Sequence, residues 1–319
     1  MKKYFVVSDI HGYFDIFHNA LLKAGFEEEN PEQILIVCGD IFDRGKQPLE
    51  VYNYLKDFPK ERRILIRGNH EFLLRHLVER EEPLTHDLHN KTYHTLYNII
   101  GKDYEEEEAK RRIEYIKHVY DGMYNNKEFL EKDSRKREKF NHKLFHNRTL
   151  QHILKWIDSD EWVPFYELGP YIFVHSFLPT QVCANDPSWQ THCIIEKWRE
   201  CDPKSTVVGN RQWEQATWEC PFKLYKDNIE SPELKDKILV CGHWHTADFW
   251  NTLENKNYSV YDFNPIFISK NYPGLIGIDA CTAATKGCNV LIINEDMSLE
   301  PHSHKEYIIE TVMEEKNNE

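Results

Sequence analysis

The sequence lacks the features that mark membrane and secreted proteins. No segment approaches the roughly 20 consecutive apolar residues that are needed to span a bilayer. The apolar run at the amino terminus ends at Ser8 and Asp9, so it is much shorter than the core of a signal peptide. We therefore expect a soluble cytoplasmic protein.

Paired cysteine motifs are also missing. The eight cysteines of the chain are scattered singly, with no C-x-x-C pair. Cys38, Cys241 and Cys281 lie in or beside apolar strand runs, where cysteine behaves as a small hydrophobic residue. This spacing argues for a reducing compartment and against a disulfide framework or a zinc knuckle.

Basic residues are outnumbered by acidic residues in the chain. The chain of 319 residues carries a formal net charge of -13, and its isoelectric point is near 5.7. Proteins that bind nucleic acid usually present a basic face, so this balance argues against nucleic acid as a partner. The length allows a large core, and we expect one domain that carries a sizeable insertion.

What the sequence does contain is a recurring pattern, in which an apolar run typical of a buried strand ends in a polar turn. The turns are SDIHG (8–12), GDIFDRG (39–45), RGNHE (67–71), VHS (174–176) and GHWH (242–245). A single helix separates each of the first three runs from the next, which predicts parallel strands with right-handed crossovers. In such sheets ligands bind beyond the carboxyl ends of the strands, where these turns fall.

The segment 81–164 has a different character. It is highly charged, low in glycine and patterned as helices, and we interpret it as a helical insertion, or cap, within a catalytic domain formed by 1–80 and 165–319. Its blocks 102–112 and 127–140 mix charges of both signs, which is typical of solvated helix faces. A weaker alternative is that the basic second block contacts a phosphorylated substrate.

A later segment is rich in tryptophan and contains Arg199 and Arg211. Two interpretations stay open. The tryptophans are buried and support a loop, or they form a substrate wall in which an arginine binds a phosphate.

The polar residues at the strand ends share one chemistry. They offer carboxylate, carboxamide and imidazole donors, which suit borderline or hard divalent metals, and the absence of cysteine among them argues against a structural zinc site. Seven ligands are too many for one ion, but they fit two ions if one carboxylate bridges. The residues are Asp9, His11, Asp40, Asn69, His175, His243 and His245.

The order of these motifs resembles the calcineurin-like metallophosphoesterase superfamily. The DRG and RGNHE forms resemble its phosphoprotein phosphatase branch, of the bacterial and phage type. The resemblance covers 1–80 and 170–295 and leaves the helical insertion outside. It implies an α/β fold of four layers, in which a β-sandwich of two mixed sheets is flanked by helices. That expectation replaces the simple parallel sheet.

The resemblance also implies how the ligands divide. The first metal would be held by Asp9, His11, Asp40 and His245, and the second by Asp40, Asn69, His175 and His243, with Asp40 bridging. We expect manganese as the metal, although iron, zinc and nickel suit the same ligands.

Catalytic roles follow from the same resemblance. A hydroxide that bridges the metals would attack a phosphoryl group held by the metals and Arg44. His70, held by Asp43, would protonate the leaving oxygen. A second arginine, Arg199 or Arg211, would also bind the phosphoryl group, and the Trp-Arg setting favours Arg199.

Two motifs depart from the usual forms of the phosphatase branch. GHWH has the two-histidine form of the wider superfamily, and VHS replaces Val-His-Gly or Val-His-Ala. Within RGNHE, Arg67 and Glu71 are interpreted as a supporting salt link or a helix-start charge.

The function that this resemblance implies is a metal-dependent phosphoesterase acting on phosphomonoesters, with serine or threonine phosphoproteins as one substrate class. An alternative is the hydrolysis of a dinucleoside polyphosphate or another nucleotide. A second alternative, from a different class, is a metal-binding scaffold without catalysis that acts through its helical insertion.

Overall fold

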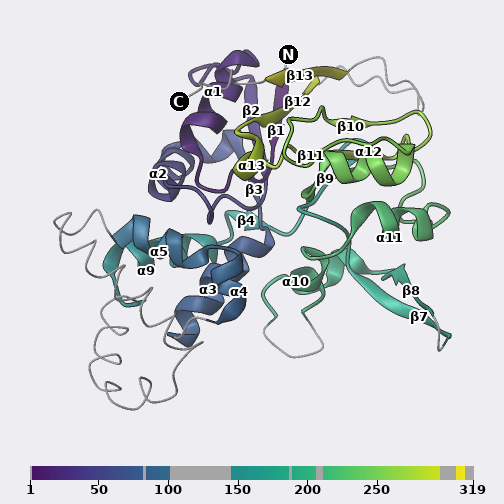
Figure 1. Ribbon diagram of the computed structural model, residues 1–319, viewed down its shortest axis with the longest axis horizontal. Coiled ribbons are helices and arrows are strands. Elements are labelled where there is room, and N and C mark those ends of the chain that lie inside the picture. Colours follow the sequence, from purple (N-terminus) through teal and green to yellow (C-terminus); the bar gives the residue numbers. More distant parts are fainter. Residues whose placement is uncertain are drawn as a thin grey trace.

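The fold is a pair of mixed β-sheets packed face to face and flanked by helices (Figure 1). The computed structural model describes residues 2–81, 84–100, 145–186, 189–205, 211–294 and 307–312. This arrangement confirms the four-layer α/β sandwich. None of the described helices combines the length and the apolar character that a membrane span requires.

The first sheet has the strand order β13-β12-β1-β2-β3-β4. Its strands β1 to β4 pair in parallel, as the alternation of strands and helices predicts, whereas β12 and β13 are antiparallel. The strands are β1 (Lys3–Val7), β2 (Gln33–Cys38), β3 (Arg63–Ile66), β4 (Trp162–Val163), β12 (Cys288–Asn294) and β13 (Tyr307–Val312).

The second sheet has the order β10-β11-β9-β6-β5. Its central strand β9 is parallel to both β6 and β11, so the strands that end in VHS and GHWH run in the same direction. The strands are β5 (Tyr166–Leu168), β6 (Tyr171–Phe173), β9 (Ile238–His245), β10 (Phe267–Ile268) and β11 (Leu275–Asp279).

Alternate residues of the strands face different cores. In β1, Val6 lies between the two sheets with Ile36 and Val240, whereas Phe5 and Val7 pack under the outer helices. This alternation is the ordinary consequence of the two-residue period of a strand. Because both faces are covered, the strands are apolar throughout, as the sequence indicates.

Helices cover each outer face. The first sheet is covered by α1 (Phe14–Lys23), α2 (Pro48–Asp57), α3 (Asn69–Arg80), α5 (Thr92–Ile100) and α9 (Arg148–Ile157). On the side of the second sheet lie α10 (Gln212–Ala216), α11 (Pro221–Asn228) and α12 (Thr246–Glu254). Short elements complete the fold: α4 (Thr85–His89), α13 (Thr282–Thr285) and the 3-10 helices η1 (Lys60–Arg62) and η3 (Trp198–Glu200).

The described part of the predicted insertion is mostly helical. Leu96 and Ile99 of α5 and Ile153 of α9 belong to the same buried cluster as Phe5 of the central strand β1. These helices therefore contribute to the hydrophobic core on the outer side of the first sheet. The charged blocks 102–112 and 127–140 lie outside the described residues, and the division into catalytic domain and insertion stays a prediction.

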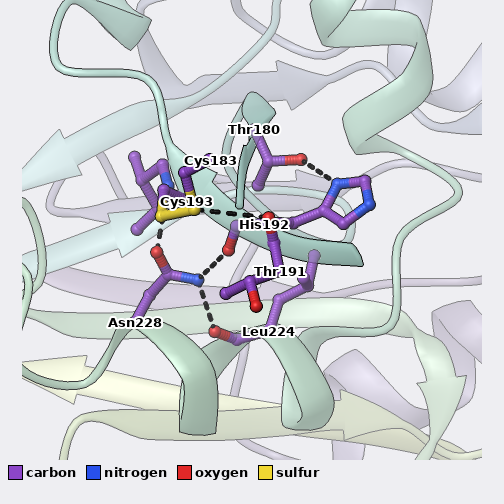
Figure 2. The surroundings of a disulfide bond; sticks show 8 residues. Thr180, Cys183, Thr191, His192, Cys193, Leu224 and Asn228 are labelled. Carbon is purple, nitrogen blue, oxygen red and sulfur yellow. Dashed lines mark hydrogen bonds between the residues drawn. A yellow bond between two sulfur atoms is a disulfide. The ribbon is translucent and has the colours of Figure 1, made fainter. Parts of the chain in front are cut away.

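A separate hairpin, β7 (Thr180–Asp186) and β8 (Trp189–Ile194), carries a disulfide between Cys183 and Cys193 (Figure 2). The spacing of the cysteines argued against a disulfide framework, yet this one local bond forms. Antiparallel pairing of the two strands brings the Cα atoms to 5.8 Å, and cysteine spacing alone does not reveal that pairing.

Asn228 attaches the hairpin to α11 (Figure 2). Its Oδ1 accepts a hydrogen bond from the backbone N–H of Ile194 at 2.9 Å, and its Nδ2 donates to the carbonyl of His192 at 2.9 Å. Elsewhere Cys38, Cys241 and Cys281 are buried free thiols, as the apolar runs around them predict.

Candidate metal centre

The polar turns of both sheets converge at one edge of the sandwich, beyond the carboxyl ends of the parallel strands. Asp9 follows β1, Asp40 follows β2, Asn69 follows β3 and His175 follows β6, and all four are almost completely buried. Buried polar side chains of this kind require partners, which places them in a functional or tightly bonded site.

The backbone of these turns is bent into the left-handed region. The φ angles are 53° at Asp9, 50° at His11, 56° at Asp40, 71° at Asp43 and 63° at His243. Residues other than glycine rarely adopt this conformation, and such strained positions cluster at functional sites. Here the bend turns each side chain from the strand direction toward its neighbours.

Two glycines let the carboxylates pack directly on the backbone. A Cβ atom at Gly68 would lie 2.2 Å from Asp40 Oδ1, and one at Gly242 would lie 2.2 Å from Asp9 Oδ2. Any larger residue would push the carboxylates out of place, so the glycines of RGNHE and GHWH are steric requirements of the site.

One group of ligands, which we call the His175 half, comprises Asp40, Asn69, His175 and His243. The Nε2 atom of His175 lies 2.8 Å from Asn69 Oδ1, 3.3 Å from His243 Nδ1 and 3.4 Å from Asp40 Oδ2. His175 Nδ1 donates to the carbonyl of Cys38 at 2.8 Å, which turns Nε2 into the site. The structure brings the predicted ligands of the second metal together.

The other group, the Asp9 half, comprises Asp9, His11, Asp40 and His245. His11 Nε2 lies 3.8 Å from Asp9 Oδ1 and 3.9 Å from Asp40 Oδ2. His11 Nδ1 donates to the carbonyl of Phe42 at 2.9 Å, so Nε2 is again the atom presented to a ligand. His245 is about one-third exposed, and its Nε2 lies 3.9 Å from Asp279 Oδ2.

Asp40 belongs to both halves. The donor atoms of Asp40, His175 and His243 lie within 4.8 Å of one another, and so do those of His11, Asp40 and His70. A carboxylate shared by two donor groups is the arrangement that a bridged pair of metals requires.

The electrostatics of the site fit divalent cations. Burial, and then the carboxylates of Asp279 and Asp40, raise the pKa of Asp9 well above its usual value. Burial also lowers the pKa of His11, and that of His243 to about 3, which favours the neutral imidazole that binds metals. Burial and the neighbouring carboxylates therefore disfavour the charged form of Asp9, and a bound cation would favour it. With oxygen and imidazole donors in two groups, these residues fit two divalent metal ions.

His70 and Asp43 form a buried pair beside the ligands. His70 Nδ1 lies 2.6 Å from Asp43 Oδ2, and the ring presents Nε2 at 3.7 Å from Asp40 Oδ2. Thr92 Oγ1 donates to Asp43 Oδ2 at 2.8 Å, and Thr95 Oγ1 donates to Asp43 Oδ1 at 2.7 Å. Both threonines belong to α5, so the predicted insertion supplies part of the site.

The three candidate arginines lie in different settings. Arg44 Nη2 is 3.4 Å from His70 Nε2, so its guanidinium is beside the candidate acid. Arg199 forms two hydrogen bonds with Glu167, at 2.8 and 3.0 Å, and its guanidinium stacks 4.1 Å over the ring of Trp198. Arg211 Nη1 lies 3.9 Å from Glu214 Oε2. It stays a prediction that Arg199 or Arg211 is the second arginine that binds the phosphoryl group.

Glu71 does more than the sequence suggests. It is fully buried and accepts hydrogen bonds from the backbone N–H groups of Gly68 at 2.8 Å, Asp40 at 3.0 Å and Ile41 at 3.0 Å. The first bond fits a helix-start charge. The other two tie the RGNHE turn to the GDIFDRG turn. Burial, and then Asp40, raise the pKa of Glu71 to about 7.

Sequence reasoning also missed Thr92, Thr95 and Asp279. Asp279 is buried at the end of β11, and it could have been found by the same strand-end rule that found Asp9. The threonines give a weaker signal, because a Thr-x-x-Thr spacing on one helix face does not name the partner that it meets.

Comparisons with known proteins agree with this geometry. A family model described as calcineurin-like phosphoesterase matches residues 2–247. A symmetrical bis(5'-nucleosyl)-tetraphosphatase from Buchnera aphidicola is 38% identical over 74 residues, which is 23% of this chain and 26% of the relative. One from Hamiltonella defensa is 34% identical over 70 residues, 22% of this chain and 24% of the relative. The matched part spans only about a quarter of the length of these relatives.

Solved structures are more distant. A serine/threonine phosphatase from Saccharomyces cerevisiae, with similarity to human phosphatase PP5, is 15% identical with a TM-score of 0.46, over 99% of this chain and 82% of that one. A cold-active protein-tyrosine phosphatase from Shewanella is 14% identical with a TM-score of 0.44, over 92% of this chain and 76% of that one. These scores are too low to carry an argument.

Proposed function

The chain belongs to the calcineurin-like phosphoesterase family, and from that premise we propose that it hydrolyses phosphomonoesters with two divalent metal ions. The observation that carries the proposal is the position of Asp40, whose Oδ2 lies 3.4 Å from His175 Nε2 of one half and 3.9 Å from His11 Nε2 of the other. A site built for a single ion would not need a shared carboxylate between two sets of imidazoles.

The residues of the two halves hold the metals in this proposal. Asp9, His11, Asp40 and His245 bind one ion, and Asp40, Asn69, His175 and His243 bind the other. Manganese is the metal we propose. When bound, the pair supplies an activated water and neutralises charge on the phosphoryl group.

The residues beside the metals position the substrate and move a proton. The guanidinium of Arg44 presents a planar pair of donors to phosphoryl oxygens. His70 Nε2 donates a proton to the leaving oxygen, and Asp43 orients the ring through Nδ1. Thr92 and Thr95 fix the carboxylate of Asp43 in turn.

Two substrate classes fit this chemistry. Serine or threonine phosphoproteins are one class, because the chemistry requires only a phosphomonoester and a protonated leaving oxygen. Dinucleoside polyphosphates are the second, and the partial likeness to two symmetrical bis(5'-nucleosyl)-tetraphosphatases favours them. A metal-binding scaffold without catalysis is the remaining alternative.

The test is Asp40→Asn, which removes the shared negative charge while keeping the shape of the side chain. We expect the purified wild-type protein to bind close to two manganese ions and to hydrolyse p-nitrophenyl phosphate. The variant should lose both properties, with a rate at least about 10³-fold lower. Metal content by mass spectrometry and a colorimetric assay measure them.

The outcomes separate the alternatives. Wild-type activity that Asp40→Asn retains would reject the two-metal site. Metal binding without hydrolysis of any phosphomonoester, or of the phosphoanhydride bonds of a dinucleoside tetraphosphate, would favour the scaffold.

A further inference from the structure

Trp218 is exposed beside a candidate ligand of the metal centre. The residue is 44% exposed, whereas the other tryptophans whose side chains the structure describes are buried or half-buried. The centroid of its indole ring lies 5.9 Å from that of the His243 imidazole, and the ring planes are nearly perpendicular, at 84°. A large aromatic surface is therefore open to solvent at the edge of the site.

The turn that carries Trp218 is held in place by hydrogen bonds from two strand ends. The carbonyl oxygen of Glu219 accepts from Ser176 Oγ at 2.5 Å and from Trp244 Nε1 at 2.9 Å. Ser176 follows His175 in the VHS motif, and Trp244 lies between the two histidines of GHWH. The position of the exposed indole is thus coupled to the positions of the metal ligands.

Further bonds fix the same turn from the α10 side. The carbonyl of Ala216, the last residue of α10, accepts from the backbone N–H of Phe177 at 3.2 Å. The backbone N–H of Trp218 donates to the carbonyl of Gln215 at 2.9 Å. The main chain that carries the indole is therefore held by hydrogen bonds on both sides of Trp218.

Ser176 and the two-histidine motif around Trp244 are also where the sequence departs from the usual forms of the phosphatase branch. Glycine or alanine at position 176 could not donate a side-chain hydrogen bond to Glu219. The side chains of Ser176 and Trp244 meet at one carbonyl oxygen, which belongs to the residue that follows Trp218. This convergence gives them a common role at the edge of the site.

Single exposed apolar residues are common on protein surfaces and need no explanation. Trp218 differs because it is anchored and because it adjoins a ligand-bearing strand end. An anchored ring loses little conformational freedom when a partner stacks on it, which favours binding. The partners that suit an indole best are flat aromatic rings, and one such stack raises affinity roughly tenfold.

We propose that Trp218 determines specificity by stacking on a planar aromatic ring carried by the leaving group of the substrate. The inference rests on the proposed function, because a phosphoester bound at the centre is what brings the ring within reach. A nucleobase and a phenyl ring present the same chemistry, and the experiment distinguishes these two sources.

The experiment measures KM and kcat of the manganese-loaded full chain for adenosine 5'-monophosphate, phenyl phosphate and glycerol 2-phosphate. We expect Trp218→Leu to raise KM for an aromatic substrate about tenfold relative to glycerol 2-phosphate, with little change in kcat. Trp218→Phe, which keeps a ring, should retain most of the preference. Tyr261→Leu is the matched control, since Tyr261 is a 75% exposed aromatic residue with no place in the site.

Each outcome decides the proposal. If Trp218→Leu raises KM for adenosine monophosphate alone, the ring that stacks on Trp218 is a nucleobase. If it raises KM for phenyl phosphate alone, that ring is a phenolic ring. Equal changes for all three substrates, or none, overturn the role of Trp218 and leave the proposed function intact. If the wild-type protein hydrolyses none of the three, the proposed monoesterase function fails and this inference falls with it.

Discussion

The two halves of the candidate metal centre differ in how closely their ligands approach. In the His175 half, one imidazole nitrogen lies 2.8 to 3.4 Å from three other ligand atoms. In the Asp9 half, His11 lies 3.8 and 3.9 Å from its carboxylates, and His245 is about one-third exposed. The first half is already closed by hydrogen bonds, whereas the second leaves room between its donors.

The difference indicates two ways to prepare a metal site. The His175 half is organised by direct contacts that a metal must replace, including the short one between His175 and Asn69. Each half has an imidazole that bonds to a backbone carbonyl, His175 to Cys38 and His11 to Phe42, but the donors of the Asp9 half lie farther from one another. Binding to the first half exchanges existing bonds, and binding to the second half fills a space.

The variant His70→Asn tests whether His70 is a proton donor or a metal ligand. The question arises because a donor atom of His70 lies within 4.8 Å of those of His11 and Asp40. We expect His70→Asn to keep both metals and to slow substrates with poor leaving groups roughly 10²–10⁴-fold, since it removes the proton donor. The rate for p-nitrophenyl phosphate, whose leaving group needs little protonation, should change much less.

Asp43→Asn is the matched variant for His70→Asn, and it should reproduce the same dependence on the leaving group. Loss of one metal from His70→Asn would instead make His70 a ligand of the Asp9 half. Metal content and a series of aryl and alkyl phosphates provide the measurement.

The variant Asp279→Asn tests whether Asp279, which is not a proposed ligand, strengthens metal binding by the Asp9 half. We expect Asp279→Asn to weaken binding of one manganese ion about 10- to 100-fold, because a residue behind a ligand sets its orientation and charge. The other ion should bind as in the wild type. Calorimetric titration of the metal-free protein measures both affinities.

Asp262→Asn, at an exposed carboxylate, serves as the control for Asp279→Asn. If Asp279→Asn weakens the binding of both ions equally, the two halves do not bind their metals independently.

A separate effect, on stability rather than on metal binding or rate, concerns the proton on His175. Burial alone would lower the pKa of His175, but Asp40 and Asp9 raise it to about 10. Because the folded-state value lies above the ordinary value of about 6.5, the paired proton stabilises the metal-free fold fully below that pH. This contribution is lost as the pH rises toward 10, and metal binding at neutral pH should release the proton.

Urea unfolding of the metal-free protein between pH 6 and pH 10 measures this contribution. We expect the transition midpoint to fall with pH in the wild type and to fall less in His175→Gln. Identical slopes in the two proteins would show that the contacts of the His175 half do not depend on this proton.

The convergence of the candidate ligands is predictable from the sequence because their signal is local. Asp9, Asp40, Asn69 and His175 each follow an apolar run directly, and parallel strands bring such ends together. For Asp9, Asp40 and Asn69, which follow strands of the first sheet, the order of strands and helices is enough to predict this convergence. The family resemblance adds the sandwich, since single runs do not show that β6 and β9 belong to a second sheet.

The supporting contacts are not predictable in this way, because they join distant parts of the chain. Thr95 meets Asp43 across 52 positions, and Ser176 meets Glu219 across 43. The sequence around each of these residues does not indicate which distant residue it contacts. Arg199 illustrates the same limit, since its contacts with Glu167 and Glu233 depend on packing rather than on spacing.

The two threonines of α5 bear on how the proposed tasks of the site are distributed along the chain. The candidate metal ligands all lie outside the predicted insertion 81–164, but the carboxylate that is bonded to His70 is held by Thr92 and Thr95 inside it. Metal capture and proton delivery therefore depend on different stretches of polypeptide. A change in the docking of α5 would leave a metalloprotein that is loaded yet selective for substrates whose leaving groups need no proton. Under the proposed function, the helical segment would thus give the chain a way to alter its substrate range without changing its metal ligands.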